Sequence, residues 1–170
     1  MKNLFILLLV PLSLLNAQQI AINEEEATVK FVFTDEELEG TISDFQFTGS
    51  VDLSDMEDSE ISGSVLMETL DTDNWFRDRH LRSKKYFHKK EYPRLYFKSN
   101  SIRGQQNEFV VKGDLTIKGV SKPVTFTFTK APGRLIGSAI INTMDFNITI
   151  YDGRERNVVN IYINLAFSEE

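Results

Sequence analysis

Apolar and polar residues alternate along most of this chain with a period of two, which is the pattern of a half-buried β-strand. The alternation is clearest at 125–129, which reads TFTFT, and at 159–167, which reads VNIYINLAF. The same pattern, with turn residues between its segments, predicts strands in nine ranges: 27–33, 40–53, 61–70, 95–102, 109–118, 123–130, 134–143, 146–151 and 157–167.

Eight or nine short strands joined by turns indicate an all-β fold, either an antiparallel sandwich or a barrel. Nearly every strand has one apolar face, so all of them share one interior. The inward positions mix phenylalanines with small residues such as Gly63, Gly113 and Gly137. This mixture favours a barrel with room along part of its lumen, because eight strands enclose enough space for one small or elongated ligand. The alternative is that the glycines mark bulges and side chains fill the lumen, and periodicity alone leaves both open.

One segment, 74–93, interrupts the strand pattern and reads NWFRDRHLRSKKYFHKKEYP. It contains the only tryptophan and both histidines of the chain. Asp73 can cap a helix that begins at Asn74, and Asp78 precedes Arg82 by four residues, the spacing of a helical ion pair. We expect a short helix and a loop that close one end of the barrel.

Helical spacing predicts that Phe76, Arg77, His80 and Leu81 share one face of this helix. If that face covers the barrel mouth, Arg77 and His80 would meet the polar head of an amphiphile whose tail lies in the lumen. The alternative is that these two side chains tie loop carbonyls and carboxylates together.

The first residues, 1–17, have the pattern of a secretory signal peptide: Lys2, an apolar run from Leu4 to Leu15, and a small residue at Ala17. The run is short for a bilayer span of roughly 20 residues, and Pro11 interrupts it. We expect cleavage near Ala17, a periplasmic or secreted product, one domain at 18–170, and no stable membrane span.

Composition narrows the function classes. The formal net charge is −6, and −7 without Lys2, so the chain is not expected to bind nucleic acid, which favours basic surfaces. It contains no cysteine, which excludes disulfides, thiolate metal sites and cysteine nucleophiles. Two histidines, His80 and His88, are too few for a metal site without carboxylates, and no GxSxG motif occurs. We therefore expect a binding protein with no catalytic residue, metal or cofactor.

Several motifs arrive in a specific order: FRDRHLRS from Phe76, Tyr86-Phe87, YPRLYFKS from Tyr92, and GDLTIKGVSKPV from Gly113. In order and spacing they resemble the YceI family, over essentially the whole of 18–170. Two features differ from the family pattern. Asn147 replaces a glycine in the DFNI sequence, and the first hairpin is short and lacks a histidine.

The resemblance implies an extended, lipocalin-like antiparallel β-barrel that is exported and holds a long-chain amphiphile. The family's ligands are polyisoprenoids, isoprenoid quinones or fatty-acid-like lipids, and membership implies no established catalytic residue. With the apolar periodicity, it predicts a ligand-binding set along the lumen and at its mouth: Phe31, Val65, Met67, Phe97, Phe109, Val111, Leu115, Phe126, Phe128, Ile161 and Ile163, with Phe76, Arg77, His80, Leu81, Tyr86 and Phe87 at the mouth.

Two other functions stay open at this stage: a stress-response or interaction module with a filled barrel, and an enzyme that acts on a lipid. The sequence also leaves open which lipid is bound, whether it is transported, stored or sequestered, and whether the barrel forms a homodimer.

Overall fold

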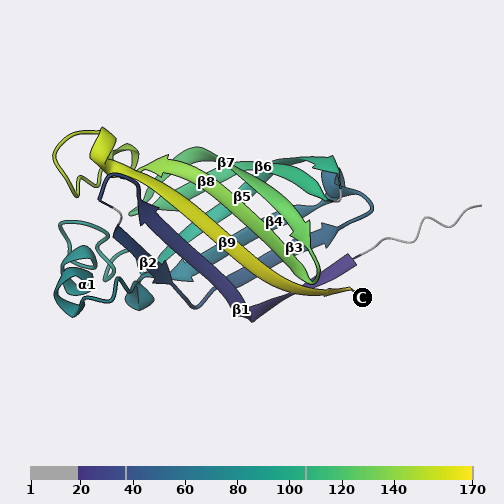
Figure 1. Cartoon of the computed structure of the whole chain (residues 1–170), viewed down its shortest axis with the longest axis horizontal. Helices are drawn as coiled ribbons and strands as arrows, with labels where there is room; N and C mark the ends of the chain where they lie inside the picture. The colour runs from purple at the N-terminus through teal and green to yellow at the C-terminus, as the bar shows by residue number, and fades with distance from the viewer. Residues whose placement is uncertain (1–18, 37, 106, 170) are drawn as a thin grey trace, which may run out of the picture.

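The computed structural model describes residues 19–36, 38–105 and 107–169, so the predicted signal peptide lies outside the described residues. The described chain is mostly β-structure (Figure 1). Its strands are β1 (Gln19–Phe33), β2 (Leu38–Ile42), β3 (Gln46–Asp52), β4 (Glu60–Leu66), β5 (Arg94–Gln105), β6 (Glu108–Ile117), β7 (Val120–Ala131), β8 (Arg134–Asn142) and β9 (Val158–Glu169).

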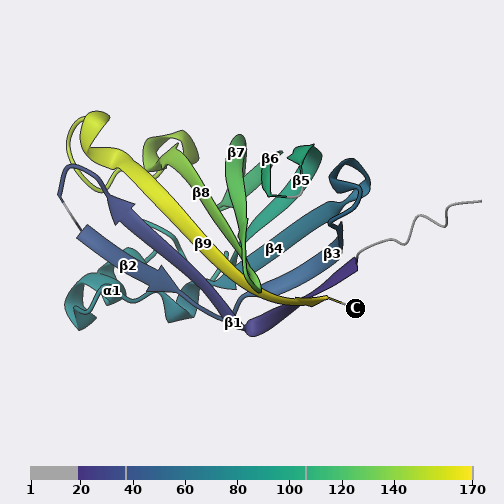
Figure 2. The same cartoon turned by 45° about the vertical axis from the view of Figure 1, so that its right-hand side comes forward.

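The strands form one antiparallel sheet that closes on itself where β1 pairs with β9 (Figure 2). β2 and β3 both pair with β1, the former along Val29–Phe33 and the latter at Gln19 and Ile20. They therefore share one position around the barrel, which gives eight positions from nine strands. The predicted all-β antiparallel barrel is confirmed, and a closed sheet also removes most exposed strand edges.

The α-helix α1 (Trp75–Leu81) belongs to the segment between β4 and β5. It lies at one end of the barrel, as does the loop 143–157 between β8 and β9 (Figure 1). We call this the α1 end. The free edge of β2 is covered there by the chain that leads to α1, because Thr41 and Asp71 exchange two backbone hydrogen bonds of 2.8 and 2.9 Å.

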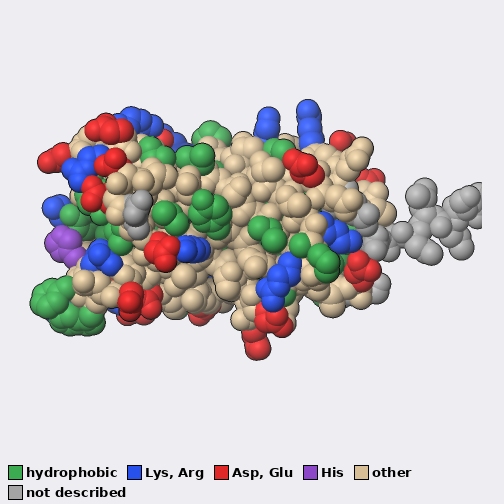
Figure 3. Space-filling view, in the orientation of Figure 1, with side chains coloured by type: hydrophobic (Ala, Val, Ile, Leu, Met, Phe, Trp, Pro, Cys, Tyr) green, Lys and Arg blue, Asp and Glu red, His purple; other side chains and the backbone are tan. Residues whose placement is uncertain are grey.

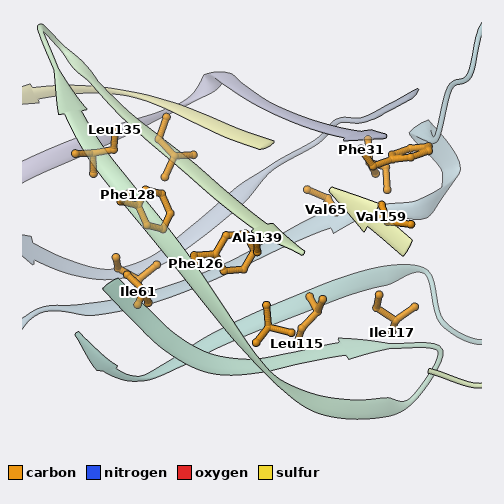
Figure 4. Packing of buried hydrophobic residues seen from close by; sticks show 14 of the residues in the cluster. Phe31, Ile61, Val65, Leu115, Ile117, Phe126, Phe128, Leu135, Ala139 and Val159 are labelled. Atoms are coloured by element: carbon orange, nitrogen blue, oxygen red, sulfur yellow. The ribbon is translucent and has the colours of Figure 1, made fainter. Parts of the chain in front are cut away.

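The half of the barrel away from α1 is filled with side chains. Its residues are almost completely buried: Val51, Leu53, Met56, Ile102, Phe109, Val111 and Leu135. The ring of Phe109 stacks on that of Phe128 at 5.3 Å between centroids, with 7° between their planes. Figure 4 shows Phe128 and Leu135 in this interior. The end opposite α1 is therefore closed by packing.

Three predicted strand ranges were wrong in part or as a whole. The range 61–70 is a strand only as far as Leu66, where the 3₁₀-helix η2 (Met67–Thr69) follows. The range 40–53 is two strands, because the chain turns at Asp44, whose φ is +53°. The range 146–151 is not a strand. Instead the 3₁₀-helix η3 (Thr143–Phe146) ends at Asn147, whose φ of +59° turns the chain. Asn147 replaces the glycine of the family motif, and asparagine is one of the few residues that tolerates this conformation.

A buried asparagine holds the rest of the 143–157 loop. Asn157 is completely buried, and its Oδ1 accepts hydrogen bonds from the backbone N–H groups of Ile150 and Tyr151 at 2.9 and 3.2 Å. Its Nδ2 donates to the carbonyls of Tyr151 and Gly153 at 2.7 and 2.6 Å. One side chain thus replaces the strand hydrogen bonds that this irregular loop lacks.

Candidate ligand cavity and its cover

The barrel contains a cavity of about 130 Å³, lined by 25 residues, which extends from the α1 end past the middle of β9. Along β9 it extends from Val159 to Leu165, which at roughly 3.3 Å per residue is about 20 Å of strand. Leu81 and Phe87 of the 74–93 segment line one end of it. Phe128 and Leu165 line the other end, beside the packed residues Phe109 and Leu135. The interior is therefore hollow along part of its length and packed at the end opposite α1.

The lining is almost entirely hydrocarbon. Only Ser64, Tyr96 and Thr143 carry a polar side-chain group, and no charged residue lies among the described residues of the lining. An ionised head group in such a space would lose its hydration without gaining a partner, which costs far more than an apolar chain gains per atom. The cavity is suited to an apolar chain, and a polar head group must remain at its end.

Ten of the seventeen predicted site residues line this cavity: Phe31, Val65, Leu81, Phe87, Phe97, Leu115, Phe126, Phe128, Ile161 and Ile163. They come from β1, β4, β5, β6, β7, β9 and the 74–93 segment, so the fold brings together residues that are far apart in sequence. Figure 4 shows Phe31, Val65, Leu115 and Phe126 directed toward the same interior.

Four predicted residues are buried elsewhere: Met67, Tyr86, Phe109 and Val111. Phe109 and Val111 do not line the cavity because they belong to the filled half of the barrel. Met67 lies in the 3₁₀-helix η2 (Met67–Thr69), and Tyr86 packs against the His80 ring at 5.0 Å. These positions have the expected apolar alternation or burial, but periodicity does not reveal how far along a strand the cavity extends.

Sequence reasoning also missed part of the lining: Val29, Phe33, Ile42, Phe45, Ile61, Leu70, Leu95, Ile117, Ile141, Val159 and Leu165. The signal was present for several of them. Val29 and Phe33 share the inward parity of Phe31 on β1, and Val159 and Leu165 share that of Ile161 on β9. Leu70 carries no periodic signal because it follows a 3₁₀-helix rather than lying in a strand.

The predicted room along part of the lumen exists, and Gly63 is part of its lining, but phenylalanine rings take up the space beside the inward glycines. A phenylalanine ring lies where each glycine's Cβ would be, in the pairs Gly40–Phe31, Gly63–Phe45, Gly113–Phe97 and Gly137–Phe128. A ring placed over a glycine lies against the barrel wall, an arrangement known to stabilise glycines in sheets. The glycines therefore determine where the rings lie, and through them the width of the lumen.

The helix α1 is fixed to the barrel by its buried residues Asp78 and Leu81. Asn74, not Asp73, is its N-cap, and the Asn74 side chain accepts a hydrogen bond from the Arg77 N–H at 3.1 Å. Asp78 is 6% exposed and accepts hydrogen bonds from the N–H and Oγ1 of Thr72. Its carboxylate also lies 3.8 Å from Arg82, as the spacing predicted.

The predicted inward face of α1 was wrong for three of its four residues. Leu81 lines the cavity, but Phe76 is 75% exposed and His80 is also exposed. Arg77 donates from Nε to Thr72 Oγ1 at 2.7 Å and from Nη2 to the Thr72 carbonyl at 2.6 Å. Arg77 thus has the alternative role, in which it holds a loop carbonyl rather than meeting a lipid head group. The physical reason is that the hydrogen bonds of Asp78 turn the helix, placing Asp78 rather than Phe76 against the barrel.

The loop after α1 is held by ion pairs at its base. Lys89 donates to the carboxylate of Glu68, whose other oxygen lies 3.8 Å from Arg82. The hydrogen bond from Lys89 lowers the pKa of Glu68 below its ordinary value. Arg82 also donates to the Leu70 carbonyl at 2.5 Å, which connects the loop to the cavity wall.

Across the α1 end, Tyr151 packs edge-on against the cavity residue Phe33 at 5.7 Å. Burial raises the pKa of the Tyr151 phenol, and the nearby Glu36 carboxylate raises it further. Arg156 stacks over the Tyr151 ring at 5.1 Å, and its hydrogen bond to Glu36 raises the pKa of its guanidinium. The phenol is therefore neutral at physiological pH.

In the described part of the chain, no three His, Asp or Glu side chains gather in a way that would hold a metal ion. No described helix has both the length and the apolar character needed to cross a bilayer.

Solved structures similar to this chain share its barrel. BcnA of Burkholderia cenocepacia superposes with a TM-score of 0.75 at 20% identity, over 87% of this chain and 99% of that one. The YCEI protein of Campylobacter jejuni superposes with a TM-score of 0.68 at 20% identity, over 78% of this chain and 85% of that one. A polyisoprenoid binding domain from Saccharophagus degradans, implicated in plant cell wall breakdown, superposes with a TM-score of 0.61 at 11% identity. The match covers 91% of this chain and 100% of that one. At these identities the likeness concerns the fold.

Sequence relatives give the family. The UPF0312 protein plu2095 of Photorhabdus laumondii is 38% identical over 87 residues, 51% of this chain and 45% of that protein. Protein YceI of Escherichia coli is 35% identical over 88 residues, 52% and 46% respectively. The matched region is thus about half the length of these curated relatives. The YceI-like domain model matches residues 21–168, nearly the whole described barrel. The chain therefore belongs to the YceI-like domain family.

Proposed function

We propose that this protein binds a long-chain lipid of the polyisoprenoid, isoprenoid-quinone or fatty-acid-like class, with the lipid tail in the barrel cavity. The observation that carries the proposal is the cavity itself, whose described lining is apolar and contains no charge. An apolar chain gains about 25 cal/mol for each Å² that it removes from water, so tail burial supplies the affinity. Membership of the YceI-like family and the fold shared with a polyisoprenoid binding domain support it.

Cavity size restricts the ligand. A volume of about 130 Å³ is close to that of an engineered cavity, on the order of 150 Å³, that binds benzene. A slender chain segment fits this space without change. A longer polyprenyl or acyl chain requires lining side chains to move. The ligand should therefore be narrow, with selectivity set by width.

The protein acts, in this proposal, as an exported carrier, store or sequestering agent rather than an enzyme. The signal-peptide pattern of 1–17 supports export, and the near-absence of polar groups in the lining supports binding without catalysis. A homodimer stays a prediction.

A second candidate function is an interaction or stress-response module whose barrel holds no ligand. The filled half of the barrel, with Phe109 and Val111 at 1% and 0% exposure, favours it. The two functions differ in whether a lipid accompanies the protein.

Organic extraction of protein purified from its native host tests the proposal. Native and then denaturing mass spectrometry should identify a long-chain lipid in near-equal molar amount. Protein that is empty, and that takes up neither a prenyl quinone nor a fatty acid when these are offered, contradicts the proposal and favours the interaction module.

A further inference from the structure

An aromatic pair projects from the α1 end of the molecule. Trp75 and Phe76 are 64% and 75% exposed, and their rings meet edge-on at 4.7 Å between centroids. Figure 3 shows a hydrophobic patch at this end, where Figure 1 places α1. The helix buries Asp78 and Leu81 instead, so the aromatic pair is not part of the packed interior. Two adjacent exposed aromatics on a projecting helix form one apolar surface that solvation disfavours.

The segment that carries this pair is basic. The segment 74–93 holds seven lysines and arginines against two acids, a formal charge of +5 in a chain whose total is −6. Arg79 lies over the Trp75 ring at 5.7 Å, and Lys84, Lys85 and Lys90 are exposed. Among the described residues, these four cations form no ion pair within the chain. The rest of the chain carries the difference between −6 and +5, a formal charge of −11, so the basic charge is concentrated in the segment 74–93.

The same segment reaches the cavity. Leu81 ends the helix that carries Trp75 and Phe76, and both Leu81 and Phe87 line the cavity. The opposite half of the barrel is closed by packed side chains such as Phe109 and Leu135. A lipid that enters the cavity from an end must therefore pass the α1 end, beside the aromatic pair.

We propose that the α1 end docks on the surface of an anionic lipid bilayer, with Trp75 and Phe76 inserted at the interface and Arg79, Lys84, Lys85 and Lys90 against the head groups. Aromatic side chains concentrate at the membrane–water interface, and clustered lysines and arginines are attracted to anionic leaflets. The charge complementarity and the position beside the end of the cavity that Leu81 and Phe87 line select a bilayer as the partner. The inference rests on the proposed function, because docking there gives the lipid a path between bilayer and cavity.

Trp75 is the only tryptophan, so its fluorescence reports on this surface alone. With vesicles of phosphatidylcholine and phosphatidylglycerol, its emission should shift to shorter wavelength, and lipids brominated near the head group should quench it. Vesicles of phosphatidylcholine alone should give a much smaller effect. Absence of a shift with the anionic vesicles overturns the proposal and leaves a protein as the partner of this surface.

Sedimentation with the same vesicles tests the residues. The double variant Trp75→Ala/Phe76→Ala should bind at least about tenfold more weakly, because both inserted side chains are lost. Ile140→Ser is the matched control, since Ile140 is 70% exposed but lies on β8, and it should bind as the unchanged protein does. Arg79→Gln/Lys84→Gln/Lys90→Gln should weaken binding, whereas Lys112→Gln/Lys122→Gln on the barrel wall should not. Equal binding by the aromatic variant and the control overturns the proposal.

Lipid uptake separates this inference from the proposed function. Offered a prenyl quinone in detergent, the Trp75→Ala/Phe76→Ala variant should take it up to the same stoichiometry as the unchanged protein, because neither residue lines the cavity. Uptake in both proteins without vesicle binding in either overturns only the docking surface. Vesicle binding without uptake contradicts only the proposed function.

Discussion

The ring of Phe128 on β7 occupies the space that a Cβ at Gly137 on β8 would need, so that an added Cβ would lie 2.6 Å from Phe128 Cζ. Phe109 stacks on the other side of the Phe128 ring, at 5.3 Å. The ring is therefore held between a neighbouring ring and a residue without a side chain. The glycine keeps the ring against the wall at the inner end of the cavity.

Gly137→Ala should displace this ring toward the cavity, because Phe109 blocks the other direction. We expect a loss of about 1–3 kcal/mol in the free energy of unfolding, the usual cost of overpacking, and reduced uptake of a prenyl quinone. Chemical denaturation and ligand titration measure the two effects. Ser138→Ala, the adjacent outward residue, is the control and should change neither. Adding Phe128→Leu to Gly137→Ala should restore part of the stability; a double variant as unstable as the sum of its single changes would contradict this relationship.

Asn157→Ala should destabilise the 143–157 loop strongly. The change leaves the partly buried N–H groups of Ile150 and Tyr151 without this partner, at a cost of up to about 1–3 kcal/mol for each group that stays unsatisfied. We expect a total loss of about 2–4 kcal/mol in the free energy of unfolding, measured by denaturant titration. Asn160→Ala on β9 serves as the control and should cost less than about 0.5 kcal/mol. Equal effects of the two substitutions would show that Asn157 does not hold the loop.

Arg77→Ala and His80→Ala distinguish the two roles considered for these residues. Arg77→Ala removes two donors to Thr72 and should lower the free energy of unfolding by about 1–3 kcal/mol, with ligand uptake retained by the folded fraction. His80→Ala should affect ligand uptake little, because His80 is exposed and does not line the cavity. Loss of uptake by fully folded His80→Ala would return this side chain to the ligand site.

Stability should depend on pH through Glu68. Its folded-state pKa is lowered by the hydrogen bond from Lys89, so its contribution is present at neutral pH, above the unfolded pKa. As the pH falls below the ordinary value of 4.5 and through the lowered folded pKa, the contribution is lost. The unchanged protein should therefore exceed Glu68→Gln in stability at pH 7, and the difference should shrink in acid. Thermal unfolding across this range measures it, and a difference that is independent of pH rules the explanation out.

Much of the fold could be predicted because strand burial follows a period of two. The inward residues of β7 and β9 were identified in this way, and closure of the barrel follows from a single shared interior. The break at Asp44 and the loop around Asn157 could not be predicted, because positive φ angles and side-chain hydrogen bonds set them rather than alternation. Sequence periodicity therefore specified which face of a strand is buried, but not where regular pairing ends.

The cavity was predicted in part for a related reason. The period of two predicts that Phe126 and Phe109 both point into the barrel. Only Phe126 lines the cavity, because packing across the barrel decides which part of the interior is hollow. The face of α1 was mispredicted because a helix of seven residues has too few turns for its apolar residues to fix its orientation. The hydrogen bonds between Asp78 and Thr72 fix it instead.

The most direct measurement of the central claim compares two adjacent residues of β9 that face opposite sides of the wall. Ile161 lines the cavity, and Tyr162 is 44% exposed on the outer face. Ile161→Trp should fill the cavity and abolish uptake of a prenyl quinone, with folding verified by circular dichroism. Tyr162→Trp adds the same ring outside the barrel and should leave the stoichiometry near one. Equal uptake by both variants would contradict a ligand site inside the barrel.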